Sequence, residues 1–358
     1  MIDQARLFQT DGEPIFCAPY GNGHINETYL LVDSTAREYI LQKINKTVFR
    51  DPESLMKNIS AITAHLRKKG SKAREALTLI PARDGREWLV DGDGEHWRLY
   101  QFITDSICLD RAADGEDFRE SALAFGRFQR QLADFPAQTL TETIPRFHDT
   151  PYRYMALRNS ITDDAHGRAE GAKEEIEFAL AREAYAPKLL DMLNSGKLPL
   201  RVTHNDTKLN NVLFDRETRK ALCVIDLDTV MPGLSVNDFG DSIRFGASTA
   251  AEDERDLSKV SFSLTLFQKY TEGFLSAYGD ELTECERAHL RDGAKMMTLE
   301  CGVRFLTDYL SGDIYFRTGR EGQNLDRCRT QFKLVEEMEI NWEEMRMIVD
   351  SRHVHATC

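Results

Sequence analysis

The 358-residue chain predicts an α+β protein with two lobes: a small strand-rich N-terminal lobe and a larger, mainly helical C-terminal lobe. Two observations lead to this prediction. Over much of the first hundred residues, short apolar runs are separated by turn residues, which is typical of strands; beyond them, apolar residues recur at helical spacing. We place the first lobe at residues 1–103 and the second at residues 104–358, with a hinge near residues 101–106.

The first lobe is expected to be an antiparallel sheet. Its strand candidates lie at residues 15–19, 28–32 and 38–44, and a Gly-Asn-Gly turn separates the first two; an apolar run at 97–103 ends the lobe. Residues 77–81 and 87–90 flank Asp84-Gly85, a dipeptide that favours tight turns, so we expect them to pair as a hairpin.

Helices are expected in both lobes. One runs from Pro52, a favoured first-turn residue, to about Gly70. In the second lobe a helix carries Phe118 to Leu132 on one face, and a long helix runs from about Lys173 to Leu193. A cleft between a sheet lobe and a helical lobe is a natural place for a ligand.

Composition excludes several classes of function. The net charge of −13 disfavours a broad nucleic-acid-binding surface, which needs clustered Lys and Arg. Seven scattered cysteines without a C-x-x-C pair argue against a disulfide framework and a zinc site. We find neither a signal peptide nor a membrane-spanning stretch, so we expect a cytoplasmic protein with no membrane partner.

The most informative motif is H-x-D-x-K-x-x-N, which runs from His204 to Asn211. In phosphoryl transfer, the Asp of such a loop orients the attacking hydroxyl and takes its proton. An Asn five residues later supplies a neutral oxygen to Mg²⁺. The motif therefore predicts Asp206 as the catalytic carboxylate, with Lys208 leaning toward the transferred phosphate and Asn211 on the metal.

A hairpin with its turn near Thr218 is expected to follow this loop. Counting outward from the turn puts Asn211 almost opposite Asp226, and Asp228 lies on the same strand face. We therefore expect Asn211 and Asp226, assisted by Asp228, to hold Mg²⁺ beside Asp206. Asp238-Phe239-Gly240 spells the metal motif of protein kinases but is expected to be helical. We therefore expect Asp238 or Asp241 to brace the catalytic loop or to contact substrate.

The first lobe supplies candidate contacts to ATP. Gly21, Asn22 and Gly23 lie between two strands, where backbone N–H groups can approach phosphates, although Asn-Gly there also simply makes a turn. Lys43 is the candidate phosphate-binding cation, but Gln42 competes for the inward position because neighbouring strand residues alternate faces. The hinge residues Gln101 and Phe102 complete the expected nucleotide site.

Beyond these motifs, the sequence closely resembles the bacterial N-acetylhexosamine 1-kinases of the aminoglycoside phosphotransferase and choline kinase superfamily. The likeness covers almost the whole chain. It is carried by the stretches Y-G-N-G-H-I-N (20–26), T-E-T-I-P-R-F-H-D-T-P (141–151), residues 199–211, I-D-L-D (225–228), F-G-D-S-I-R-F-G-A-S-T (239–249) and residues 301–316.

This resemblance implies a protein-kinase-like fold that uses Mg-ATP to phosphorylate the anomeric hydroxyl of N-acetylglucosamine or N-acetylgalactosamine. It also implies sugar contacts from His24, Phe245, Arg304 and Tyr315. Arg304 has a second interpretation, an ion pair with Asp308 one helical turn on.

Other functions stay open. The acceptor could be another sugar, choline or ethanolamine, homoserine or an aminoglycoside, because one fold serves many acceptors. A catalytically silent pseudokinase is a further alternative, which the intact Asp206, Asn211 and Asp226 disfavour. The preferred epimer, the nucleotide preference, the degree of lobe closure and the oligomeric state do not follow from the sequence.

Overall fold

The computed structural model describes residues 1–21 and 25–351, and the chain divides into two compact units. Unit 1 comprises residues 1–108, 134–145 and 211–232, and unit 2 comprises residues 109–133, 146–210 and 233–358. Both units are therefore built from separate stretches of the chain. The assignment of residues 1–103 to one lobe stays a prediction.

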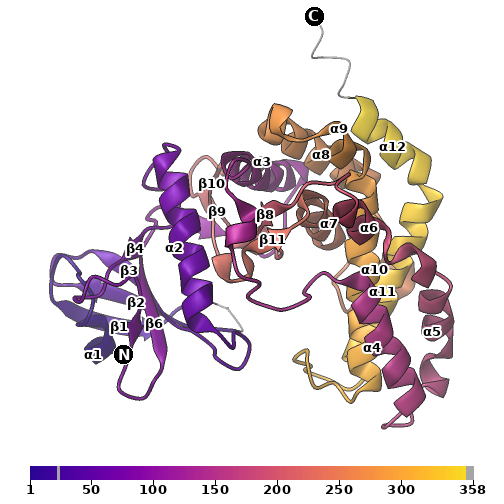
Figure 1. Ribbon diagram of the computed structural model, residues 1–358, viewed down its shortest axis with the longest axis horizontal. Coiled ribbons are helices and arrows are strands. Elements are labelled where there is room, and N and C mark those ends of the chain that lie inside the picture. Colours follow the sequence, from indigo (N-terminus) through magenta and orange to yellow (C-terminus); the bar gives the residue numbers. More distant parts are fainter. Residues whose placement is uncertain (22–24, 352–358) are drawn as a thin grey trace, which may run out of the picture. The chain divides into compact units, whose positions relative to one another are not determined.

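Unit 1 is built around an antiparallel sheet with the strand order β1-β2-β3-β6-β4, in which β5 also pairs with β6 (Figure 1). The elements of its first stretch are α1 (Ile2–Ala5), β1 (Pro14–Pro19), β2 (Glu27–Asp33), β3 (Glu38–Lys43), α2 (Pro52–Lys68), β4 (Leu79–Ile80), β5 (Leu89–Val90), β6 (His96–Gln101) and β7 (Ser106–Cys108). Its later stretches add η1 (Ala137–Thr139), β9 (Val212–Asp215), β10 (Ala221–Val224) and η5 (Leu227–Thr229).

The sheet has a buried apolar side. Leu31, Leu41 and Leu99, from neighbouring strands, are fully buried in one cluster with Phe8 and Trp97. Burial of such side chains is worth roughly 1.5–3 kcal/mol each and is the main force holding the sheet together.

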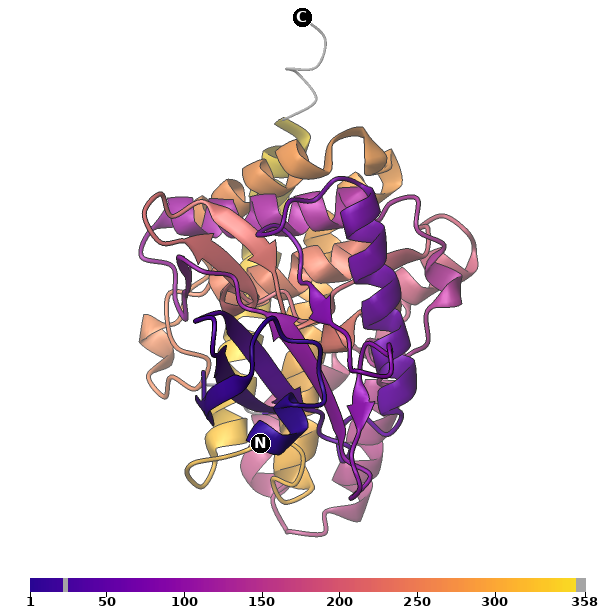
Figure 2. The same ribbon diagram turned by 90° about the vertical axis from the view of Figure 1, so that its left-hand side faces the viewer.

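Helix α2 begins and ends where the sequence predicts. The Asp51 side chain accepts a hydrogen bond from the Ser54 N–H (3.1 Å), Pro52 occupies the first turn, and Gly70 beyond the last turn has a φ of 90°. The helix lies along one flank of unit 1 (Figure 2), and Met56 Sδ is 4.0 Å from Arg98 Nη1 of β6.

The hairpin expected around Asp84-Gly85 is wrong in its pairing. A tight turn is present, with the Ala82 N–H donating to Arg86 O (2.7 Å), but β4 and β5 each pair with β6 instead of with each other. Each of these strands is only two residues long, and the longer β6 offers both of them hydrogen-bonding partners.

Unit 2 is mainly helical. Its helices are α3 (Gly115–Gln131), α4 (Thr150–Asp163), η2 (Glu170–Ala172), α5 (Lys173–Leu180), η3 (Glu183–Tyr185), α6 (Lys188–Asn194), α7 (Ser235–Gly246), η6 (Leu257–Lys259), α8 (Leu264–Tyr278), η7 (Gly279–Glu281), α9 (Glu284–Ala288), α10 (Leu290–Leu310), α11 (Gln323–Ile340) and α12 (Trp342–Asp350). The short strand β8 (Arg201–Thr203) also belongs to it. The elements η4 (Leu209–Asn211) and β11 (Met231–Gly233) each contain residues of both units.

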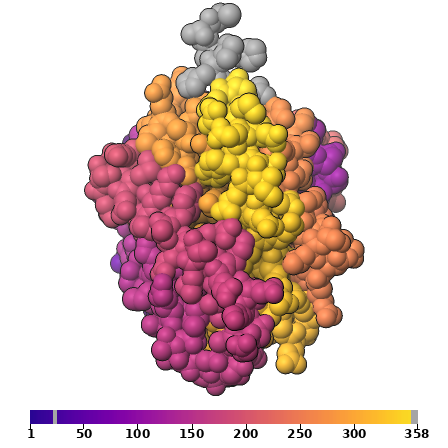
Figure 3. All heavy atoms as spheres, turned by 90° about the vertical axis from the view of Figure 1, so that its right-hand side faces the viewer, coloured from indigo at the N-terminus to yellow at the C-terminus, as the bar shows by residue number. Residues whose placement is uncertain are grey.

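The long helix predicted between Lys173 and Leu193 is wrong. The structure has α5, η3 and α6 instead, and Pro187 is the N-cap of α6. A proline disfavours helical geometry at the residue before it and lacks an N–H to donate, so the helix cannot run through. Figure 3 shows α11 and α12, in yellow, beside the magenta surface of the segment that carries α5.

Within the described ranges, every helix is too short or too polar to cross a lipid bilayer.

Candidate active site

Asp206 and Lys208 lie in the loop that follows β8 and form an ion pair in unit 2. Lys208 Nζ is 2.8 Å from Asp206 Oδ1. The negative charge of Asp206 raises the pKa of Lys208 well above its ordinary value, against the opposing effect of burial. Lys208 therefore keeps its positive charge next to the predicted catalytic carboxylate.

Asp238 braces this loop from α7. Its carboxylate accepts hydrogen bonds from the backbone N–H groups of His204 (2.8 Å) and Asn205 (2.8 Å) and from the Gln129 side chain. Burial raises the pKa of Asp238, and the donating groups limit the rise. Asn205 has a φ of 64°, a left-handed conformation that Asn tolerates better than most residues. The prediction that Asp238-Phe239-Gly240 is helical and braces the loop is confirmed.

Asp241 holds the next residue of the loop. Its Oδ2 accepts from the Thr207 N–H (2.9 Å) and its Oδ1 from Arg244 Nε (3.0 Å), while Arg244 Nη1 donates to Glu252 (2.7 Å). Phe245 lies partly buried in the last turn of α7. Asp241 thus braces the loop as well, and the roles of Asp241 and Phe245 in substrate binding stay predictions.

In unit 1, the β9–β10 hairpin brings Asn211 and Asp226 to the same end. Val212 pairs with Val224, and the next hydrogen bond runs from the Ile225 N–H to Asn211 O (2.9 Å), so Asp226 lies one residue from the position opposite Asn211. The predicted hairpin is confirmed. An amide and a carboxylate oxygen at neighbouring positions fit Mg²⁺, which typically binds through few protein ligands together with phosphate oxygens. Asp226 has a φ of 58°, in the left-handed region.

Asp228 has a different environment from the one predicted. One of its carboxylate oxygens accepts a hydrogen bond from Arg98 Nη1 and the other from Asn26 Nδ2. Arg98 and Asp228 form a buried pair, with side chains 1% and 3% exposed. Both oxygens of Asp228 are therefore engaged within unit 1, and its role as a metal ligand stays a prediction.

Arg98 is a residue that the motif analysis missed. It pairs across the sheet with Gln42 of β3, and its Nε donates to Gln42 Oε1 (2.9 Å). Lys43 points to the opposite face, where its Nζ is 3.5 Å from Glu27 Oε1. An arginine inside the apolar run W-R-L-Y (97–100) was the available signal, because a charge at such a position needs a buried partner.

The remaining nucleotide candidates lie at the ends of strands in unit 1. Gly21 has a φ of 77° and no atom close to where a Cβ would stand. The rings of Tyr20 and Phe102 pack edge to face, with centroids 5.9 Å apart, and Gln101 is exposed. Asn22, Gly23 and the sugar candidate His24 lie outside the described residues.

Arg304, on α10 in unit 2, lies among aromatic rings. Its guanidinium carbon is 5.1, 5.4 and 5.8 Å from the ring centroids of Phe147, Phe316 and Tyr315, and its Nη2 is 3.5 Å from Tyr315 Oη. Burial would lower the pKa of Arg304, but Tyr315 and Cys301 raise it, so the side chain stays cationic. The alternative ion pair with Asp308 is wrong.

Asp308 instead holds the loop that carries Tyr315. Its carboxylate accepts from the backbone N–H groups of Ile314 (3.0 Å), Tyr315 (2.7 Å) and Phe316 (2.9 Å), and from Asn324 Nδ2 (2.9 Å). A carboxylate held by three backbone donors fixes the loop next to Arg304.

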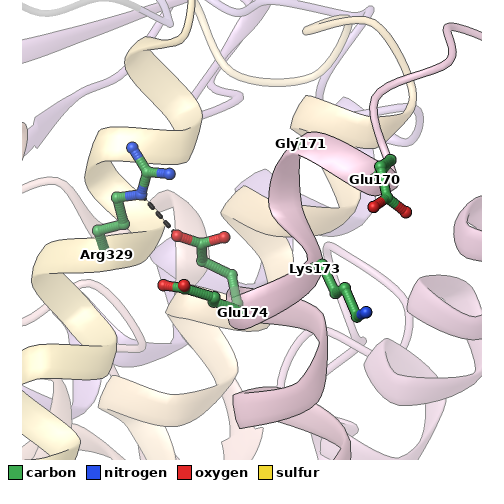
Figure 4. Close-up of a pocket in the computed structure, with 6 residues that line it drawn as sticks. Glu170, Gly171, Lys173, Glu174 and Arg329 are labelled. Atoms are coloured by element: carbon green, nitrogen blue, oxygen red, sulfur yellow. Dashed lines mark hydrogen bonds and ion pairs between the residues drawn. The ribbon is translucent and has the colours of Figure 1, made fainter.

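A surface hollow lies elsewhere on unit 2, between Arg329 of α11 and the segment that includes η2 and the start of α5 (Figure 4). It is lined by Glu170, Gly171, Lys173, Glu174, Glu175 and Arg329. Arg329 Nε donates to Glu175 Oε1 (2.6 Å), so this cation of the hollow is paired with one of its carboxylates. We assign no function to this hollow.

The comparison with solved structures shows the same fold in several kinases. The chain is similar to a microcompartment-associated aminopropanol kinase at 14% identity and a TM-score of 0.60, covering 97% of this chain and 98% of that one. It is also similar to an amicoumacin kinase in complex with AMP-PNP, Ca²⁺ and Ami (14% identity, TM-score 0.63, 93% and 92% covered). A third similar structure is an aminoglycoside phosphotransferase from Alicyclobacillus acidocaldarius (11% identity, TM-score 0.64, 98% and 96% covered).

These likenesses confirm the predicted fold class, with a strand-rich N-terminal region and a helical C-terminal region. A family model identifies the family of the chain in addition to its fold. The model of the phosphotransferase enzyme family (APH) matches residues 17–273, which include the H-x-D-x-K-x-x-N loop and the hairpin after it. Since this match spans most of the chain, the protein belongs to the phosphotransferase enzyme family.

Proposed function

We propose that this phosphotransferase transfers the γ-phosphate of ATP to the anomeric hydroxyl of N-acetylglucosamine or N-acetylgalactosamine, producing the α-1-phosphate. Three lines support the proposal: membership of the phosphotransferase family, the H-x-D-x-K-x-x-N loop, and the sequence strings shared with N-acetylhexosamine 1-kinases. AMP-PNP and Ca²⁺ in the amicoumacin kinase complex support a nucleotide and a divalent cation here.

Asp206 is the proposed base. An anomeric hydroxyl is more acidic than an ordinary alcohol, so it needs only a carboxylate to orient it and accept its proton. The loop is held by Asp238 and Asp241, which limits the positions that Asp206 can take. Lys208, which is paired with Asp206, is proposed to stabilise the charge of the transferred phosphate.

Asn211 and Asp226 are the proposed magnesium ligands. When bound, Mg²⁺ would neutralise phosphate charge that otherwise repels the incoming hydroxyl. For the phosphates themselves we retain Gly21, Asn22, Gly23 and Lys43, and for the nucleoside Gln101 and Phe102. Because Lys43 lies near Glu27, we expect a smaller effect from its removal than from that of Lys208.

The observation that carries the choice of acceptor is the charge around Arg304. Burial lowers the pKa of Arg153, and the nearby Arg304 guanidinium lowers it further, whereas Arg244 is neutralised by its ion pairs with Asp241 and Glu252. The two neighbouring guanidinium groups of Arg304 and Arg153 disfavour an ammonium group and suit a neutral, oxygen-rich acceptor. Aminopropanol and aminoglycosides, after which two of the similar proteins are named, contain amines.

A screen of ATP consumption tests this proposal. The acceptors are N-acetylglucosamine, N-acetylgalactosamine, glucose, galactose, choline, ethanolamine, homoserine and an aminoglycoside, and ³¹P NMR identifies the phosphorylated position. We expect turnover with the N-acetyl sugars and an anomeric phosphate in the α configuration. Preference for an amine acceptor would refute the sugar assignment, and no turnover with any acceptor would favour the pseudokinase alternative.

Asp206→Asn tests the catalytic assignment. We expect kcat to fall by about 10²- to 10⁴-fold, because the amide cannot accept the proton, while the Kd for ATP changes little. The matched control is Asp93→Asn, which changes an exposed carboxylate of unit 1 and should leave both parameters unaltered. A folded Asp206→Asn variant with normal turnover would show that another group acts as the base.

A further inference from the structure

A buried polar cluster in unit 2 joins the start of α4 to α10. Glu300 Oε1 is 2.9 Å from His148 Nδ1, and Glu300 Oε2 accepts a hydrogen bond from Thr150 Oγ1 (2.6 Å). The Glu300 side chain is 2% exposed. Burial raises the pKa of Glu300, but the hydrogen bonds from His148 and Thr150 and the positive charge of Arg304 lower it, so the carboxylate is ionised. An ionised Glu300 keeps a proton on His148 Nδ1 and fixes the orientation of the ring.

The opposite nitrogen of the same ring is an orphaned polar atom. Among the described residues, none forms a hydrogen bond with His148 Nε2, and the same holds for Arg153 Nε; both atoms are buried. A buried polar group without a partner costs about 1–3 kcal/mol, and folded proteins contain few of them. In the neutral ring with Nδ1 protonated, Nε2 is a hydrogen-bond acceptor.

Arg304 adds hydrogen-bond donors close to Glu300 and to the Phe147 ring. It lies one helical turn after Glu300 on α10 and interacts with it electrostatically. Its guanidinium group faces the Phe147 ring at 5.1 Å, and the Phe147 and His148 rings are 4.6 Å apart. The region therefore combines one acceptor, several N–H donors and an aromatic ring.

An acetamido group has the complementary chemistry. It offers one N–H, one carbonyl oxygen and one methyl group, whereas a hydroxyl lacks the carbonyl and the methyl, and an ammonium adds a positive charge. We propose that His148, held by Glu300, forms with Arg304 and Phe147 a subsite for a secondary amide of the acceptor. His148 Nε2 accepts from the amide N–H, Arg304 donates to the carbonyl oxygen, and Phe147 contacts the methyl group. This inference rests on the proposed function and specifies which part of the sugar is recognised.

Two substitutions of His148 separate its two nitrogens. In His148→Asn the short amide still reaches Glu300 but has no group in the place of Nε2. In His148→Gln the longer amide reaches the place of Nε2. We expect His148→Asn to raise the KM for N-acetylglucosamine about tenfold, the effect of losing one well-placed hydrogen bond, and His148→Gln to restore part of the loss. The KM values for ATP and for glucose should not change.

The matched control is His65→Asn, because His65 also pairs with a carboxylate: its Nε2 is 3.1 Å from Asp134 Oδ1 in unit 1. Thermal unfolding midpoints within a few degrees of the unsubstituted protein establish that each variant is folded. Equal losses for N-acetylglucosamine and glucose, or no loss for either sugar, would overturn the amide subsite.

Titration calorimetry measures the Kd of N-acetylglucosamine and of glucose, so this test does not depend on catalysis. The subsite is supported if the unsubstituted protein binds N-acetylglucosamine more tightly than glucose and His148→Asn binds both sugars equally. This holds whether or not the sugar is phosphorylated. Binding without phosphorylation would refute the proposed function and leave the subsite standing. Equal binding of both sugars by the unsubstituted protein would refute the subsite even if both are phosphorylated.

Discussion

The buried pair of Arg98 and Asp228 shows how single residues organise unit 1. Arg98 Nη1 donates to Asp228, Arg98 Nε donates to Gln42, and Gln42 Nε2 donates to Thr28 Oγ1 (3.0 Å). The network thus links three strands of the sheet to the segment after Asp226. A buried charge is tolerable only when it is paired, so each partner depends on the other.

Substitutions at Arg98 and Asp228 can separate the contributions of packing and of charge to the free energy of unfolding. We expect Arg98→Met to lower the free energy of unfolding by about 3–5 kcal/mol, because it leaves the Asp228 carboxylate buried and uncompensated. Combining it with Asp228→Leu should recover much of the loss, because the double variant replaces the ion pair with apolar side chains. Urea unfolding followed by circular dichroism measures both effects.

The control for this pair is Arg86→Met, which breaks the exposed pair with Asp84 and should change stability by less than about 1 kcal/mol. If the losses from Arg98→Met and Asp228→Leu simply add, the two residues are not coupled and the interpretation is wrong.

Residue types and spacing revealed the H-x-D-x-K-x-x-N motif, but they did not reveal the buried pair of Arg98 and Asp228. The spacing of Asp206, Asn211 and Asp226 is visible in the chain because one loop and one hairpin carry all three. The partner of Arg98 depends on the register between β3 and β6, and a slip of one residue would have turned the other face inward. Whether Asp206 acts together with Asn211 and Asp226 stays a prediction.

At the scale of elements, α7 is held against α10 by glycines. A Cβ on Gly240 would lie 2.2 Å from Gly293 O, and one on Gly293 would lie 1.9 Å from Val236 O. Both contacts are with backbone atoms, which cannot move aside as a flexible side chain can. Because α7 carries Asp238 and Asp241, this close packing also fixes the residues that brace the loop of Asp206.

Gly293→Ala should therefore weaken the contact between these helices. We expect a loss of roughly 1–3 kcal/mol in unfolding free energy, since the helices must separate to admit a methyl group, although Ala has the higher helix propensity. The thermal unfolding midpoint measures the change, with Gly171→Ala as the control because no atom lies within 4 Å of its Cβ position. An unchanged or raised midpoint for Gly293→Ala would show that α7 and α10 can move apart without cost.

The bounds of single elements were predicted better than the pairing between elements. The bounds of α2 followed from Pro52, apolar spacing and Gly70, all of which are local signals. The pairing of β4 and β5 was not local, because it depended on the competing strand β6. Pro187 was a local signal for the break before α6, but the apolar residues at helical spacing on both sides of it led to the prediction of one continuous helix.

At the scale of the whole molecule, buried carboxylates in both units are stabilised in their ionised form. Asp33 in unit 1 accepts hydrogen bonds from the N–H groups of Gly12 (2.8 Å) and Arg37 (3.0 Å) and from Thr35; despite burial, these lower its pKa to about 2. In unit 2, Arg201 and Ser235 lower the pKa of Glu286 against the effect of burial.

These lowered pKa values predict acid unfolding. A carboxyl group whose pKa is lower in the folded than in the unfolded state stabilises the protein above its unfolded pKa of about 4, and this stabilisation is lost as the pH falls toward the folded value. Asp238 has a raised pKa and acts in the opposite direction, but more carboxylates in the two units have lowered values. We expect the thermal unfolding midpoint to be nearly constant between pH 7 and 5 and to fall steeply below about pH 4.

Asp33→Asn tests how much the Asp33 carboxylate of unit 1 contributes to the loss of stability at low pH. The amide cannot ionise and leaves donors without a full partner, so we expect a loss of about 1–3 kcal/mol at pH 7. The loss should shrink as the pH falls from 4 toward 2, because the carboxyl group of the unsubstituted protein then becomes neutral as well. Glu53→Gln, an exposed carboxylate at the start of α2, is the control and should follow the unsubstituted protein at every pH. A loss from Asp33→Asn that is equally large at pH 7 and pH 2.5 would show that the charge of Asp33 contributes nothing to stability.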